Sequence, residues 1–364
     1  MKFSEKDIMA ALSTVQDPDL HNDLVSLSMV RDVKAGPERV SFTVVLTTPA
    51  CPLKEKIRRD CEEAVRKVIG DTVELDIVMS SSVTTSRDKA PVLTGVKNIV
   101  AIASGKGGVG KSTVTANLAV ALAQTGAKVG LIDADIYGPS IPVMFNCEHD
   151  QPEVKVVNRK NVIQPLDQYG VKLLSIGFLT PPDSPVVWRG PMASSALKQF
   201  IGDADWGELD YLLIDLPPGT SDIHLTLVQT VPVTGAIIVT TPQKVALADA
   251  TKGLAMFRQP QINVPVLGIV ENMAYFTPEE LPGNKYFIFG KDGGKNLSEK
   301  YGVPLLGQVP LVQGIRESGD SGLPAVMKEG VVSQAFRDLA EAMARQVAIR
   351  NATFAKTKKV ELKV

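Results

Sequence analysis

Cysteine is scarce in this 364-residue sequence: three are present, and no two of them form a C-x-x-C pair. Such sparse thiols exclude a disulfide-stapled fold and a self-contained four-cysteine metal site, and they are typical of a reducing cytoplasm. Long apolar runs are also missing, since no segment approaches the roughly 18 residues of a membrane span. The mixed charges of the opening MKFSEKD rule out a signal-peptide core. We therefore expect a soluble cytoplasmic protein with no stable membrane association.

An excess of charge of one sign is absent as well. The 39 Lys and Arg nearly balance the 40 Asp and Glu, which leaves a formal charge of −1. No global field would attract nucleic acid, so we expect no nucleic-acid partner. The hydrophobic share of 44% and the charged share of 22% are those of an ordinary globular chain. At this length, two domains are expected.

The sequence pattern divides the chain into four segments. We expect a small α/β domain over residues 1–80, a Ser/Thr-rich linker over 81–95, a larger domain over 96–350 and a basic tail over 351–364. In the first segment, Ser4 can cap a helix that carries Ile8, Leu12 and Val15. A hairpin of residues 24–33 and 40–47 follows, then a helix over 53–68 and a strand over 72–79.

The larger domain alternates short apolar runs with helical patterns. The runs comprise residues 99–103, 128–132, 211–214, 236–240 and 266–270. Runs without polar alternation suit strands that are buried on both faces, so the fold class is α/β with a parallel sheet. The Pro-rich residues 146–188 are interpreted as an irregular insertion of undetermined role.

A phosphate-binding motif, G-x-x-x-x-G-K-S, lies between the first of these runs and a helical pattern. Its glycines let backbone N–H groups surround phosphates, the lysine adds positive charge, and the serine can bind Mg²⁺. A chance glycine turn is the alternative, but the strand and helix on either side favour nucleotide binding. The predicted ATP-binding segment is Gly105, Lys106, Gly107, Gly108, Val109, Gly110, Lys111, Ser112 and Thr113.

The sequence KGGVGKS resembles the deviant Walker A loop of the MinD, ParA and nitrogenase iron-protein ATPases. In that group the extra lysine, here Lys106, reaches the phosphates of the partner subunit. The resemblance therefore implies a P-loop NTPase that closes around ATP as a homodimer, with Lys106 and Lys111 as catalytic residues. A solvated loop lysine is the simpler alternative for Lys106.

Two carboxylate segments follow at strand ends, where open α/β sheets bind their ligands. By resemblance, Asp135 orients the attacking water and Asp133 supports the Mg²⁺ shell or the loop itself, although helix capping is an alternative for this pair. The segment DLPPGT looks like Walker B with switch II, so Asp215 would hold Mg²⁺ as a further catalytic residue. Resemblance alone assigns adenine recognition to Asn272 and Pro310.

The segments DIYGPSIP and DLPPGTSD look like the Mrp/ApbC branch, the iron–sulfur cluster carrier ATPases. Residues 1–80, with TTPACPL, resemble the SufT-like iron–sulfur assembly domain. The family's C-x-x-C pair, which bridges two subunits through a cluster, is missing: after ENM the chain reads AYFTPEELP. Cys51, expected at the start of a helix, is the best remaining thiol ligand, with simple packing as the alternative. Packing is favoured for Cys61 and Cys147.

Two functions follow from this resemblance. The first is a slow, Mg²⁺-dependent ATPase that binds iron–sulfur clusters and transfers them to apoproteins, or that assists cluster-assembly proteins. The second is a nucleotide-switched regulator or scaffold that holds no cluster itself. A MinD-type membrane role for the apolar face of residues 335–347 and a ParA-type role on DNA are weaker alternatives. Hydrolysis is expected to be slow because a carboxylate that orients water leaves most of the barrier in place, and no arginine other than Arg189 lies near the predicted loops.

Overall fold

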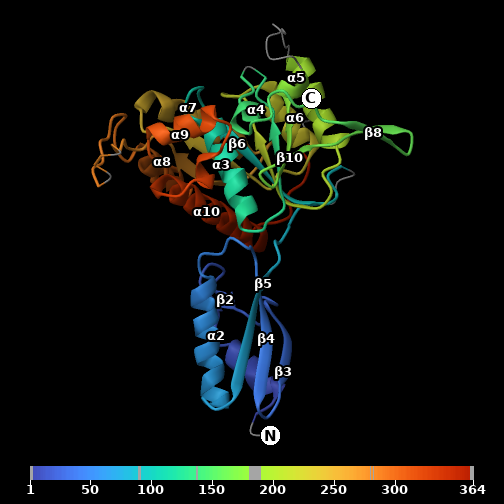
Figure 1. The fold of residues 1–364 in the computed structure, drawn as a ribbon, viewed down its shortest axis with the longest axis vertical. Helices are drawn as coiled ribbons and strands as arrows, with labels where there is room; N and C mark the ends of the chain where they lie inside the picture. The colour runs from blue at the N-terminus through green and yellow to red at the C-terminus, as the bar shows by residue number, and fades with distance from the viewer. Residues whose placement is uncertain are drawn as a thin grey trace. The chain divides into compact units, whose positions relative to one another are not determined.

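The structure is a computed structural model that describes residues 3–88, 92–136, 138–179, 190–278, 280, 281 and 283–360. Tyr137 of the DIYGPSIP segment, Arg189 and Glu279 lie outside these residues. The chain divides into two compact units (Figure 1). The smaller comprises Met1–Thr84 and Ala348–Phe354, and the larger comprises Thr85–Val347 and Ala355–Val364. Residues 348–350, expected in the larger domain, thus group with the smaller unit.

The smaller unit is an α/β layer around one apolar core. Ser4 caps its first helix with a full capping box to Asp7. The predicted hairpin is confirmed for β3 and β4, and β5 adds to β4 in parallel. The first strand of this hairpin begins at Val30 and not at residue 24. The Asp23 carboxylate accepts hydrogen bonds from the amides of Val25 and Ser26 and so holds a turn there. The elements are α1 (Glu5–Leu12), β1 (Gln16–Asp17), β2 (Asn22–Asp23), β3 (Val30–Ala35), β4 (Arg39–Leu46), α2 (Lys54–Ile69) and β5 (Glu74–Ser81).

The larger unit is built on an eight-stranded sheet in the order β10-β11-β7-β12-β6-β13-β14-β15. All neighbouring strands are parallel except β10, which pairs antiparallel with β11 at one edge. The five predicted apolar runs are all strands of this sheet, so the predicted fold class is confirmed. The strands are β6 (Val96–Ser104), β7 (Val129–Asp133), β10 (Leu166–Gln168), β11 (Val171–Ser175), β12 (Leu209–Asp215), β13 (Gly235–Thr240), β14 (Val266–Glu271) and β15 (Leu305–Gln308).

Helices cover this sheet and bury its strands. Helix α3, directly after β6, has ten buried residues out of fourteen, which places it inside the unit. The α-helices are α3 (Lys111–Gln124), α4 (Ile141–Met144), α5 (Gly190–Gly202), α6 (Asp222–Thr230), α7 (Lys244–Arg258), α8 (Gly293–Tyr301), α9 (Gln313–Asp320) and α10 (Val331–Thr353). Short 3-10 helices cover Ile176–Leu179 and Ala325–Met327.

Residues of the predicted insertion, tail and linker take part in regular structure or in backbone pairing. The insertion 146–188 supplies the sheet strands β10 and β11 and a separate hairpin of β8 (Val154–Val157) and β9 (Lys160–Ile163). The expected tail is still helical to Thr353. Beyond it, Thr357 exchanges backbone hydrogen bonds with residues 86 and 88 of the expected linker, and Val360 donates to the Val228 carbonyl. Backbone hydrogen bonds therefore fix residues 86–88 of the predicted linker and residues 357–360 of the predicted tail.

The last helix, α10, packs on the larger unit through its apolar face. Phe336, Leu339, Met343 and Val347 on this face are each 1% exposed or less. This burial leaves the face unavailable for the membrane role considered above. No helix in the described part of the chain is both long and apolar enough to cross a membrane.

Candidate functional site

The candidate site lies at the carboxyl ends of the central strands, where the segment 105–110 joins β6 to α3. Asp215 ends β12, Asp133 ends β7 and Ser175 ends β11, and their Cα atoms are paired in register across the sheet. Parallel pairing therefore brings three polar residues, far apart in sequence, into one row beside the loop. The sequence motifs predicted this juxtaposition for the two aspartates but not for Ser175.

Glycine is required at two positions of the loop for different reasons. Gly110 has a φ of 76° and is the N-cap residue directly before helix α3, and a Cβ there would lie 2.2 Å from the Asn272 side-chain nitrogen. Gly105 lies against helix α7, where a Cβ would come within 2.0 Å of the Asp249 carbonyl carbon. Helix α7 and the Asn272 segment therefore fix the path of the loop.

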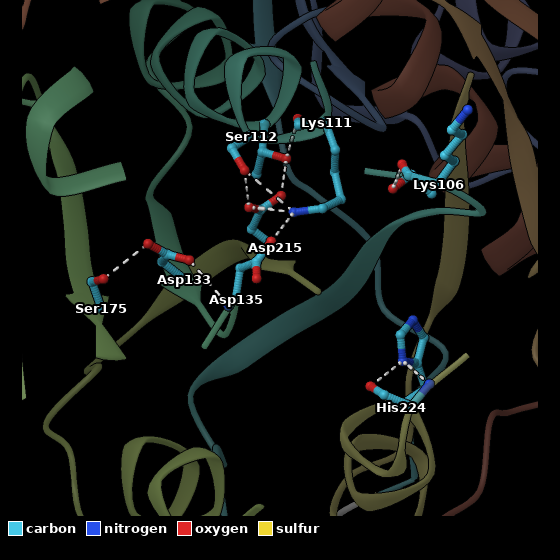
Figure 2. Close-up of polar contacts among 11 residues, drawn as sticks. Lys106, Lys111, Ser112, Asp133, Asp135, Ser175, Asp215 and His224 are labelled. Carbon is cyan, nitrogen blue, oxygen red and sulfur yellow. Dashed lines mark hydrogen bonds and ion pairs between the residues drawn. The ribbon is translucent and has the colours of Figure 1, made fainter. Parts of the chain in front are cut away.

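The Asp215 carboxylate is the centre of the polar cluster in Figure 2. It accepts the Lys111 ammonium at 2.7 Å and the Ser112 hydroxyl at 2.6 Å on Oδ2. Thr115, one helical turn after Lys111, donates to Oδ1 at 2.6 Å. Asp215 and Thr115 are fully buried and Lys111 nearly so, and a buried carboxylate needs such compensation for its lost hydration.

The charge balance of this cluster keeps Lys111 protonated. Burial alone would lower the pKa of Lys111, but Asp215, Asp135 and Asp133 together outweigh burial and raise this pKa. The Asp135 carboxylate lies 3.6 Å from the Lys111 ammonium. The site therefore holds a permanent cation at the base of the loop, where the motif requires it.

Asp133 lies behind this cluster and is fully buried. The Ser175 hydroxyl donates to its Oδ2 at 2.8 Å and the Asp135 amide donates to its Oδ1 at 3.2 Å. Burial, reinforced by the negative charge of Asp215, raises the pKa of Asp133 to about 7. Asp133 thus braces the chain that carries Asp135, and a contribution to the Mg²⁺ shell stays a prediction.

A cavity of about 230 Å³ opens in front of the loop. Lys111, Ser112 and Asp135 line it. Lys106 also lines it, but this residue is exposed and its side chain points away from the Asp215 cluster (Figure 2). The lining residues are Ser104, Lys106, Gly107, Gly108, Val109, Gly110, Lys111, Ser112, Thr113, Asp135, Gly138, Ser140, Met144 and Pro218. Every residue from Lys106 to Thr113 in the predicted ATP-binding segment therefore faces this cavity.

Asn272 and Pro310, the residues assigned to adenine by resemblance, do not line this cavity. The Asn272 amide donates to the Val109 carbonyl at 2.8 Å and so supports the loop from behind. Pro310 is buried beyond the end of β15. Adenine recognition by this pair stays a prediction.

Sequence reasoning missed three residues that hold the site together. Thr115 binds Asp215, Ser175 binds Asp133, and Glu271 accepts the Gly294 amide at 2.7 Å and the Gln308 amide at 2.5 Å. Glu271 thereby links the end of β14 to helix α8 and strand β15. The signal for Thr115 was its position four residues after Lys111, on the same helix face.

None of the three cysteines forms a disulfide. Burial raises the pKa of Cys61 and of Cys147 to about 12, so both favour the thiol over the metal-binding thiolate. Cys51 is half-buried, and helix α2 begins at Lys54, so Cys51 lies in the turn before the helix and not at its start. In the described part of the chain, no group of three or more His, Cys, Asp or Glu side chains is arranged to hold a metal ion.

Two family models match the chain. Residues 95–346 match a ParA model described as the NUBPL iron-transfer P-loop NTPase, and residues 5–75 match the iron–sulfur cluster assembly protein model. An iron–sulfur cluster carrier protein of Synechocystis is 50% identical over 345 residues, which cover 94% of this chain and 97% of that protein. The iron–sulfur cluster carrier protein of Escherichia coli strain K12 is 42% identical, over 93% of this chain and 91% of its own.

Solved structures resemble the larger unit. A nucleotide-binding protein of Archaeoglobus fulgidus in complex with ADP is 39% identical with a TM-score of 0.56, and the match covers 65% of this chain and 91% of that chain. The cell division ATPase MinD of Pyrococcus furiosus is 27% identical with a TM-score of 0.50, over 67% of this chain and 97% of that chain.

Proposed function

Because the chain belongs to the NUBPL iron-transfer P-loop NTPase family, we propose that it is an ATPase that acts in iron–sulfur cluster assembly and transfer. The observation that carries the nucleotide part is the Asp215 cluster, which gathers Lys111, Ser112 and Thr115 beside the phosphate-binding loop. The names of its relatives and the match of residues 5–75 to an assembly-protein model support the cluster part.

The donor set fits ATP with Mg²⁺. Backbone N–H groups of the loop and the Lys111 ammonium suit phosphate oxygens, while Ser112 and Asp215 offer the hard oxygen ligands that Mg²⁺ prefers. Mg²⁺, when bound, would neutralise phosphate charge. Lys111 and Ser112 would then exchange Asp215 for the nucleotide, and Asp135, on the cavity wall, would orient the attacking water. Calorimetric titration with Mg-ATP tests this assignment, and unchanged affinity in Lys111→Ala would overturn it.

Hydrolysis by the isolated chain is proposed to be slow. One carboxylate that orients water leaves most of the phosphoryl-transfer barrier in place unless a further cation enters the site. Lys106 is exposed at the mouth of the cavity, so a second copy could receive it in an ATP-bound homodimer. Rapid basal turnover of the pure protein would contradict this expectation.

The cysteines do not fit a cluster that bridges two copies through paired thiolates. Cys61 and Cys147 are buried thiols, and Cys51 is a single half-buried residue, so one chain offers at most one accessible thiol. We therefore treat the cluster as cargo, with Cys51 as the candidate thiol contact. The same observation favours a second candidate function, a nucleotide-switched scaffold that directs cluster assembly without holding the cluster.

Anaerobic reconstitution separates the two functions. Iron and sulfide would be counted per chain after reconstitution of the wild type, Cys51→Ala and the buried-thiol control Cys147→Ala. A cluster retained by the wild type and the control, but lost from Cys51→Ala, would support a carrier. No iron or sulfide in any of the three would support the scaffold.

A further inference from the structure

The hairpin of β8 and β9, named here the arm (residues 154–163), projects from the larger unit in Figure 1. It forms its own two-stranded sheet. Its three β8 valines are highly exposed to solvent: Val156 is 73% exposed, Val154 58% and Val157 47%. Isolated two-stranded hairpins are marginal in water, and exposed β-branched strands are sites where other chains pair. The question is therefore what such an exposed apolar hairpin binds.

The arm is held in one conformation at both ends. At its tip, Asn158 and Arg159 have φ values of 51° and 65°, as in the type I′ turns that match the twist of hairpin strands. At its root, the Ile163 amide donates to the Asp203 carbonyl at 2.8 Å and the Ile163 carbonyl accepts the Asp205 amide at 2.9 Å. A preformed strand loses little conformational entropy when it binds a partner.

The register shows which edge of the arm is open. The Gln164 amide donates to the Glu153 carbonyl at 2.8 Å, so this is a hydrogen-bonded pair of the ladder. Hydrogen-bonded pairs alternate along an antiparallel ladder. Val154 and Val156, opposite Ile163 and Asn161, therefore direct their N–H and C=O groups away from β9.

The two outer edges differ in what meets them. On the β9 side, the outward N–H and C=O groups of Ile163 are hydrogen-bonded to the backbone of Asp203 and Asp205. On the β8 side, no backbone hydrogen bond among the described residues reaches Val154 or Val156. The β8 edge thus presents two N–H and two C=O groups between exposed valine side chains, which is the surface that strand addition uses.

Charge identifies the kind of partner. The arm and its first flanking residue hold three cations, Lys155, Arg159 and Lys160, and one anion, Glu153. The Glu153–Lys155 pair at 3.7 Å is well exposed on both sides, so it neutralises little of this charge. Two copies of the arm would repel each other, whereas an acidic strand would be attracted.

We propose that the outer edge of β8 docks an extended acidic segment of a partner protein by β-strand addition. Val154 and Val156 supply the backbone hydrogen bonds and the apolar contact, and the cations near the tip select for acidic side chains. The docking surface lies outside the nucleotide cavity. This inference goes beyond the proposed function, and it holds whether or not the chain carries a cluster.

A peptide titration on the full chain, without nucleotide, tests the proposal. The probe is a fluorescent, capped Glu-Val-Glu-Val-Glu-Val peptide, and its charge-reversed control replaces Glu with Lys. Val156→Pro removes an outward N–H while it leaves the hairpin ladder intact, since edge positions accept proline. Val156→Ile keeps both the N–H and the β-branched side chain and is the matched control.

We expect the acidic peptide to bind the wild type and Val156→Ile, and the basic peptide to bind neither. Val156→Pro should weaken binding about tenfold, because one hydrogen bond is lost and the proline ring obstructs the edge. Lys160→Glu should weaken it about threefold, and Lys328→Glu, an exposed charge elsewhere, should leave it unchanged. Hydrogen exchange should show new protection at Val154 and Val156.

Three results would overturn the proposal. The first is no binding of the acidic peptide to the wild type. The second is equal binding to Val156→Pro when its thermal unfolding matches that of the wild type. The third is a nucleotide-free protein that sediments as a dimer and becomes monomeric in Val156→Pro, since the occupant of the edge would then be a second copy.

Discussion

At the scale of single residues, Asp215 organises the site through three donors that all belong to helix α3. Two of them, Lys111 and Ser112, are motif residues that the nucleotide needs, whereas Thr115 has no place in the motif. Thr115 can therefore hold Asp215 while the other two turn to phosphate and Mg²⁺. This division predicts a positioning role for Thr115.

Thr115→Val should lower the affinity for Mg-ATP about tenfold, since a hydrogen bond to a charged group is worth about 1.5–3 kcal/mol. The affinity for ATP in excess EDTA should change much less, because Asp215 acts through the metal. Calorimetry with and without Mg²⁺ measures both. Thr251→Val is the control, since the Thr251 hydroxyl donates to a carbonyl of its own helix. An equal loss with and without Mg²⁺ would contradict the positioning role.

His224 makes folding stability depend on pH. Its Nδ1 faces the Ser221 amide and hydroxyl at the start of α6 (Figure 2), and its Nε2 is buried without a hydrogen-bond partner among the described residues. Burial lowers the pKa of His224 from 6.5 to about 4. The unfolded chain therefore binds the proton first as pH falls. The contribution of the neutral ring is complete above pH 6.5 and is lost as pH falls towards 4.

In the wild type, protonation linked to His224 lowers the free energy of unfolding by about 3 kcal/mol as pH falls from 7 to 4. His224→Gln should remove this pH dependence. Urea unfolding between pH 7 and pH 4 measures the difference between wild type and variant. Asp133 has a raised pKa, so its protonation increases stability as pH falls, opposite to the effect of His224. Because both proteins contain Asp133, its contribution cancels when their unfolding free energies are subtracted. The exposed His149→Gln should follow the wild type, and parallel pH curves for His224→Gln would refute the assignment.

At the scale of elements, helix α7 acts as a wall behind the phosphate-binding loop. A Cβ on Gly105 would lie 2.0 Å from a backbone carbon of α7, and backbone cannot rotate away as a side chain can. Gly105→Ala should destabilise the nucleotide-free protein by about 3 kcal/mol through overpacking. Thermal unfolding measures the loss.

Gly107→Ala is the matched control in the same loop, because its Cβ would meet Pro218 at an ordinary 3.8 Å. We expect its unfolding temperature to stay close to that of the wild type. If both variants unfold at the wild-type temperature, α7 does not confine the loop. If both lose the same stability, the effect belongs to the loop backbone and not to the contact with α7.

In the larger unit, the strands that sequence reasoning found are continuous apolar runs buried on both faces, as β6 and β12 are. Two of the strands that it missed there lack that property. The four residues of β8 are all exposed, and β10 is a short, partly buried edge strand inside a Pro-rich segment. Their positions depend on long-range pairing, such as β11 with β7, which no local pattern encodes.

The site shows the same division. Motif spacing and strand ends predicted the residues that we propose for phosphate and Mg²⁺ binding, because that chemistry needs fixed residue types. Ser175 and Glu271 could not be predicted, because their roles arise from partners that are close in space only after the sheet has formed. The sequence predicts a separate basic tail, yet Thr357 in that segment pairs with Arg87.

At the scale of the whole molecule, the exposed Lys106 predicts that nucleotide binding and dimer formation can be separated. Lys106→Ala should bind ATP within about threefold of the wild type, since a solvent-exposed charge contributes little to affinity in its own copy. The Lys106→Ala variant should stay monomeric when ATP is added, because neither copy would have a lysine to contact the phosphates bound by the other. Light scattering and calorimetry on the same samples measure both effects.

Lys111→Ala should lose ATP affinity and the ATP-induced mass change together. The exposed Lys128→Ala, at the start of β7 and away from the loop, should behave as the wild type. An equal loss of affinity and of association in Lys106→Ala would refute a role for Lys106 across the dimer. A mass that does not change with ATP in the wild type would remove the proposed dimer itself.

The sheet order has a consequence for how the protein is made. Strand β6 pairs with β12 and β13, and β13 ends at Thr240, 136 residues after β6 ends at Ser104. At about 5–20 residues per second, a ribosome needs roughly 7 to 27 seconds to supply these partners. During that time an apolar strand and the glycine loop behind it leave the exit tunnel without their neighbours. Chaperone dependence should therefore be greatest for nascent chains that stop between residues 104 and 240.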